Sequence, residues 1–62
     1  MEILTVLDEL YHVNPEDEDS VIYQLRRSRS LIKFRDGRKT IILTVKNVVS
    51  IEYYGELKYE DN

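Results

Sequence analysis

An Asp-Gly dipeptide between two β-rich runs constrains this 62-residue chain more than any other feature. Asp36-Gly37 separates residues 30–35 from residues 38–44, and both runs are rich in Ile, Leu, Phe and Thr. This dipeptide is among the strongest short-range signals for a two-residue type I′ hairpin turn. We therefore expect a β-hairpin in which Arg35 faces Arg38.

Side chains alternate between the two faces of a strand, so the same segment also predicts which residues share a face. One face is apolar and contains Ile32, Phe34, Ile41 and Leu43. The opposite face is basic, and its members are Arg29, Leu31, Lys33, Arg35, Arg38, Thr40, Ile42 and Thr44.

A third strand over residues 48–54 continues the apolar face if a three-residue loop joins it to the hairpin. With residues 45–47 as that loop, Leu43 faces Val49 and Ile41 faces Ile51. Asn47 then takes the left-handed position that such loops require.

The first segment favours a helix over residues 2–12. Its apolar residues recur at helical spacing, namely Ile3, Leu4, Leu7, Leu10 and Tyr11. The β-branched Thr5 and Val6 make a strand the alternative.

Residues 15–27 carry two conflicting patterns. Asn14 as N-cap, Pro15 at the first helical position and acids in the first turn are typical of a helix. Against this, three strand formers follow one another at Val21, Ile22 and Tyr23. Val21, Tyr23 and Leu25 also alternate with Ile22, Gln24 and Arg26, as in a strand. We assign a strand to residues 20–27 and keep the helix as the alternative.

These assignments predict a single α+β domain over residues 1–62. Its N-terminal helix packs on a three- to four-stranded antiparallel meander and residues 56–62 form a polar tail, with an SH3-like or Sm-like small β-barrel as the alternative. A chain this short buries only about 60% of the surface that its unfolded form exposes, so a partner would stabilise it.

Charge is strongly partitioned along the chain, although the net charge is only −3. Residues 1–25 carry seven acids and no Lys or Arg, whereas residues 26–46 carry eight bases and the single acid Asp36. Bases that point the same way from adjacent strands repel one another, so an acidic counterpart is expected at the hairpin. That counterpart is an acidic protein partner, a nucleic-acid phosphate backbone, or acids of this chain or of a second copy.

We expect a protein partner to bind through the basic hairpin face or through a tyrosine edge, because tyrosine is enriched at interface hot spots. Nucleic acid is the alternative, disfavoured by a pI near 5.0 and by the lack of an aromatic residue interleaved on the basic face, since Phe34 belongs to the apolar face. Self-association is also expected. The candidate partner-binding residues are Arg26, Arg27, Arg29, Lys33, Arg35, Arg38, Tyr53 and Tyr54.

The sequence shows no residue cluster with the spacing of an active site, a metal centre or a phosphate-binding loop. It contains no Cys and one His, and the acids at residues 16–19 lack the spacing of a calcium loop. We therefore expect no enzyme activity, no metal and no cofactor. With no apolar run near the roughly 20 residues of a membrane span and no export signal, the expected location is the cytoplasm.

Two segments, LIKFRDG at residues 31–37 and VVSIEYY at residues 48–54, resemble the hairpins of small β-rich proteins encoded by phages and other mobile elements. The resemblance covers residues 31–54. It implies a small inhibitor or regulator directed at a host protein, and it assigns no functional residue.

Overall fold

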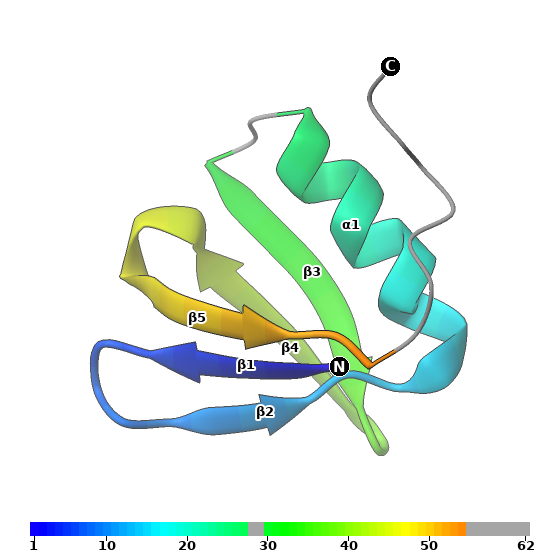
Figure 1. Cartoon of the computed structure of the whole chain (residues 1–62). Coiled ribbons are helices and arrows are strands. Elements are labelled where there is room, and N and C mark those ends of the chain that lie inside the picture. Colours follow the sequence, from blue (N-terminus) through cyan, green and yellow to red (C-terminus); the bar gives the residue numbers. More distant parts are fainter. Residues whose placement is uncertain (28–29, 55–62) are drawn as a thin grey trace.

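The computed structural model describes residues 1–27 and 30–54, which form a small α+β fold (Figure 1). The elements in chain order are β1 (Glu2–Thr5), β2 (Leu10–His12), the 3-10 turn η1 (Pro15–Asp17), α1 (Glu18–Arg26), β3 (Leu31–Asp36), β4 (Lys39–Thr44), the 3-10 turn η2 (Val45–Asn47) and β5 (Val48–Glu52). The strands form two antiparallel sheets, in the orders β2-β1-β5 and β3-β4. The predicted polar tail at 56–62 lies outside the described residues.

Residues 2–12 form the hairpin β1–β2, so the predicted N-terminal helix is wrong. Apolar residues at helical spacing pair across the hairpin instead, with Ile3 opposite Tyr11 and Leu4 opposite Leu10. The Thr5 N–H donates to the Glu9 carbonyl and so closes a three-residue loop over residues 6–8. The last residue of this loop, Asp8, has a φ of 60°, the left-handed conformation that such loops need and that Asp tolerates. This turn chemistry, together with the β-branched residues of β1, outweighs the helical spacing.

The predicted strand over residues 20–27 is also wrong, because residues 18–26 form the helix α1. Glu18 and Asp19 lie in its first turn and Arg26 in its last, an arrangement that the helix dipole favours. Val21 is completely buried and Leu25, one turn later, packs against the core. Charge at both ends and this i, i+4 stripe therefore outweigh the strand propensity of three residues.

The β3–β4 hairpin is confirmed, but its turn lies one residue later in the chain than predicted. Each residue of β3 therefore faces a residue two positions further along β4, and Arg35 faces Thr40 rather than Arg38. Asp36 faces Lys39, so Gly37 and Arg38 are the central residues of the turn. Gly37 has a φ of 62° and Arg38 is not left-handed, as in a type II′ turn and unlike the expected type I′. The observed register places Phe34 opposite Ile41 and Ile32 opposite Leu43, and this pairing of apolar side chains is what favours it.

The third strand of the predicted meander does not pair with β4. Residues 45–47 form η2 rather than a hairpin loop, and Asn47 is not left-handed. β5 pairs with β1, which places Ile51 opposite the completely buried Ile3. The meander was expected because the N-terminal segment was assigned to a helix, which left β4 as the partner for this strand.

The two sheets share one core. Its buried residues come from both sheets, from α1 and from the segment between β2 and η1, and they are Ile3, Val13, Val21, Ile32 and Phe34. The Tyr11 ring meets the Phe34 ring edge-on, with 6.0 Å between their centroids. The prediction that Val49 belongs to the apolar face is wrong, because Val49 is 58% exposed and lies at an irregularity in the β1–β5 pairing.

Candidate functional site

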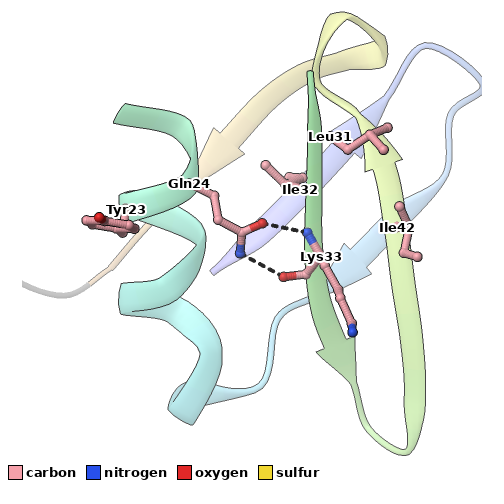
Figure 2. A pocket seen from close by; sticks show the side chains of 6 residues that line it. All are labelled: Tyr23, Gln24, Leu31, Ile32, Lys33 and Ile42. Carbon is pink, nitrogen blue, oxygen red and sulfur yellow. Dashed lines mark hydrogen bonds between the residues drawn. The ribbon is translucent and has the colours of Figure 1, made fainter. Parts of the chain in front are cut away.

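The outer edge of β3 is closed by side chains from residues 14–24 and by the backbone N–H of Asn14, which donates to the Arg35 carbonyl at 2.9 Å. Gln24 accepts a hydrogen bond from the Lys33 N–H (2.8 Å) and donates one to the Lys33 carbonyl (2.9 Å), as Figure 2 shows. Asn14 makes the same pair of contacts with Gly37, at 2.8 and 2.9 Å. A side-chain amide offers one acceptor and donors together, so Gln24 and Asn14 take the place of a neighbouring strand.

Asp17 completes this edge and neutralises a candidate basic residue. Its Oδ2 accepts hydrogen bonds from the backbone N–H of Arg35 (2.8 Å) and from Nε of the same residue (3.1 Å), and its Oδ1 lies 3.0 Å from Nη2. Glu16 Oε1 lies 3.8 Å from the same guanidinium. For Arg35, the expected counter-charge is thus supplied by this chain's own acidic run.

Asp17 and Arg35 shift each other's pKa. Hydrogen bonds from the Arg35 side chain, and then from its backbone, hold the pKa of Asp17 below its ordinary value. The Asp17 carboxylate in turn raises the pKa of Arg35. A bidentate, charge-assisted contact of this kind fixes the guanidinium in place, so Arg35 is not a freely available cation.

A groove with a volume of about 360 Å³ lies between α1 and the outer face of the hairpin (Figure 2). It is lined by Tyr23, Gln24, Leu31, Ile32, Lys33 and Ile42. Three of these side chains are large, apolar and strongly exposed, with 46% of Tyr23, 51% of Leu31 and 61% of Ile42 accessible to solvent. Lys33 faces Ile42 across the hairpin, which places a cation within this apolar surface.

The remaining candidate bases that the structure describes lie at the end of α1 and in the hairpin turn. Arg27 holds Tyr23, since its guanidinium carbon lies 5.1 Å from the ring centre and its Nε and Nη2 donate to the phenol oxygen at 2.9 and 2.7 Å. Arg26 ends α1, and Arg38 lies in the hairpin turn. The predicted Arg29 lies outside the described residues. The structure thus places Lys33 and Arg35 on one face, as predicted, but does not gather all the bases there.

Tyr54 belongs to a different surface, on the three-stranded sheet. Its hydroxyl donates to Glu52 Oε2 at 2.5 Å and lies 3.3 Å from Glu2 Oε1. Glu2 faces both Glu52 and His12 across the sheet, and His12 Nδ1 lies 3.1 Å from Glu2 Oε2. The hydrogen bond to Glu52 is the main cause that raises the pKa of Tyr54 to about 12. The predicted tyrosine edge is therefore separate from the hairpin face, and Tyr53 beside it is half-buried.

Five residues of the groove were not among the predicted site residues, namely Tyr23, Gln24, Leu31, Ile32 and Ile42. Ile32 was expected in the core, and it is buried there. For Leu31 and Ile42 a signal was present, because alternation assigned these large apolar residues to the solvent face of the hairpin. Tyr23 and Gln24 could not be placed, because they were assigned to a strand.

No group of three His, Asp or Glu residues that could hold a metal ion occurs within residues 1–27 and 30–54. In that same part of the chain, no helix is long and apolar enough to cross a membrane. In comparisons with known proteins, no family model, no curated protein and no solved structure matches this chain. Its function must therefore be inferred from its own side chains.

Proposed function

We propose that this chain is a small, non-catalytic protein-interaction module whose partner binds the outer face of the β3–β4 hairpin and the adjoining side of α1. The observation that carries the proposal is the clustering of Tyr23, Leu31 and Ile42 around one groove. Single exposed apolar residues are common on protein surfaces, but three that share a groove are typical of an interaction site.

The composition of the groove also suits a protein partner. Tyrosine and arginine are the residues most enriched at interface hot spots, and here Arg27 holds the Tyr23 ring in one position. A ring that is already fixed loses little conformational entropy when a partner covers it. Lys33 adds a positive charge that favours a partner with acids beside its apolar contacts.

The nucleic-acid alternative is weaker, because Arg35, one of the six bases expected to bind phosphate, is already paired. Arg35 is held by Asp17 and flanked by Glu16. A phosphate that binds Arg35 would have to displace the Asp17 carboxylate and approach the negative charge of Glu16. A role as inhibitor or regulator of a host protein, in the cytoplasm, stays a prediction within this proposal.

Panning a displayed random-peptide library on the folded chain tests the proposal. We expect enriched peptides to lose at least about tenfold in affinity, or about 1.4 kcal/mol, when Leu31→Ser or Ile42→Ser removes an apolar contact. Val49→Ser is the matched control, since Val49 is 58% exposed on the other sheet and Ile42 is 61% exposed. Circular dichroism confirms that each variant is folded. No enrichment, or equal losses in all three variants, would reject the hairpin face.

A further inference from the structure

β4 presents an open backbone edge, and the contacts of β3 show which groups it exposes. The backbone groups of Lys33 and Arg35 point away from β4, because Gln24 and Asp17 bind them. Lys33 faces Ile42, and Arg35 faces Thr40. In an antiparallel pair, residues that face each other point their backbone groups either toward each other or both outward. The N–H and C=O groups of Thr40 and Ile42, and of Thr44 by the same alternation, therefore point away from β3.

Nothing in the described part of the chain closes this edge. No hydrogen bond within residues 1–27 and 30–54 reaches the outward backbone groups of Thr40, Ile42 or Thr44, and β4 ends its sheet. Figure 2 shows β4 on the side of β3 away from α1, so the helix that closes one edge of the hairpin cannot reach the other. An unpaired edge strand is a template for a further strand.

The sequence of the edge suits strand addition. Residues 40–44 are Thr-Ile-Ile-Leu-Thr, an uncharged run with high β-propensity. Six residues of strand span about 20 Å, which is enough for a short peptide to form a ladder. Ile42 lies on this edge and also lines the groove, so a strand added here would contact one of the exposed apolar side chains of the groove.

Charge indicates what kind of strand would bind. Arg38 and Lys39 precede the uncharged run, Lys46 follows it, and residues 37–47 contain no acid. Lys33 adds a fourth cation on the outer face. We propose that the β4 edge binds an extended acidic segment of a partner protein, which adds as a strand with β-branched residues at its centre and acids at both ends. This inference rests on the proposed function, because the same partner would contact Ile42, which lines the groove.

A second copy of this chain is the competing occupant, and its charges fit less well. Two antiparallel β4 edges that match all three outward residues would pair Ile42 with itself and Thr40 with Thr44. The same register would bring Arg38 of each copy near Lys46 of the other, just beyond the two ends of the new ladder. Like charges that face each other across strands are destabilising, whereas an acidic strand would neutralise the same cations.

Two labelled peptides test the proposal, EETVTVTEE and its charge-reversed counterpart KKTVTVTKK. Fluorescence anisotropy measures binding, and amide hydrogen exchange reports where it occurs. We expect the acidic peptide to bind at least about tenfold more tightly than the basic one and to slow exchange at the amides of Thr40, Ile42 and Thr44. Thr40→Pro should abolish binding, because it removes an outward N–H that no residue of the described chain uses. Ile42→Lys is a second edge variant if Thr40→Pro does not fold.

The outcomes separate this inference from the proposed function. In one outcome the acidic peptide binds and Leu31→Ser weakens this binding, but the three amides are not protected from exchange. This result would overturn strand addition and leave the hairpin face as the interaction site. In another outcome the amides are protected without peptide, this protection grows with protein concentration, and the mass of the particle doubles. This result would show that a second copy occupies the edge, and it would also overturn the binding of an acidic strand there. Equal affinity for the two peptides would reject the role of charge.

Discussion

Removing the Gln24 side chain should destabilise the domain, because this one amide closes the middle of the β3 edge. Gln24→Ala deletes two hydrogen bonds to the backbone of Lys33, at 2.8 and 2.9 Å. Each is worth about 0.5–1.5 kcal/mol net, and water can replace part of the loss at this exposed edge. We therefore expect a loss of about 1–2 kcal/mol, which lowers Tm by about 4–16 °C in a domain of this size.

Gln24→Glu makes the same test more specific. A carboxylate can still accept from the Lys33 N–H, but it cannot donate to the Lys33 carbonyl and repels it. When protonated, the carboxyl group can do both, as the amide does. The folded state should therefore raise the pKa of this Glu, and the stabilisation is present at low pH and lost as the pH rises through that pKa. The stability gap to the parent chain should thus be smaller at pH 3.5 than at pH 7.

Urea unfolding followed by circular dichroism at both pH values gives these free energies. Ser20→Ala is the control, because Ser20 is the other partner of the Gln24 amide nitrogen, at 3.1 Å, and its loss should cost less than about 0.5 kcal/mol. A Gln24→Ala variant as stable as the parent would refute the role of this side chain in closing the edge. So would a Gln24→Glu variant whose stability gap does not change between the two pH values.

Three further predictions follow from individual contacts. Because Arg35 lowers the pKa of Asp17, the pair favours the folded state above the ordinary Asp pKa, and unfolding measurements should show stability falling below about pH 4. Asp17→Asn should reduce that fall, and an unchanged pH profile would argue against the ion pair. The absorbance difference between the chain and Tyr54→Phe should titrate near pH 12 and shift toward 10 in Glu52→Gln, whereas a midpoint that Glu52→Gln does not move would exclude Glu52 as the cause. Asp8→Gly should stabilise the domain by about 0.5–1 kcal/mol and Asp8→Ala should destabilise it by about 1 kcal/mol, since only Gly adopts a φ of 60° without strain. Thermal melts measure both effects, and a higher Tm for Asp8→Ala than for Asp8→Gly would contradict this reasoning.

The β3–β4 hairpin could be predicted because its signals are local. A Gly at the turn and alternating apolar residues on both sides specify the strands and their faces without any knowledge of the rest of the chain. The exact register could not be predicted from the turn alone, since Gly37 fits either central position of a two-residue turn. Packing of Phe34 against Ile41 decides between these positions, and packing is a tertiary effect.

The first 27 residues could not be predicted correctly, because each segment is locally ambiguous. Ile3 and Tyr11 have the spacing of a helix, yet they face each other across β1 and β2. The decision lies in distant partners, since β1 is held by β5, almost fifty residues later in the chain. The site was incomplete for the same reason. Arg35 and Lys33 were placed on the right face, but Gln24 and Tyr23 join them only because residues 18–26 are a helix.

The acidic segment before α1 connects these errors to the proposed function. If residues 20–27 were a strand beside β3, their backbone would close its edge, and the acids at residues 16–19 would be left to solvent. As a helix, the segment closes the edge with side chains instead, and this arrangement requires Asp17 to lie against Arg35. Asp17 and Glu16 are thus directed to Arg35 on β3, while β4 keeps its cations and its open backbone. An acidic strand from a partner would supply to β4 what Asn14, Asp17 and Gln24 supply to β3.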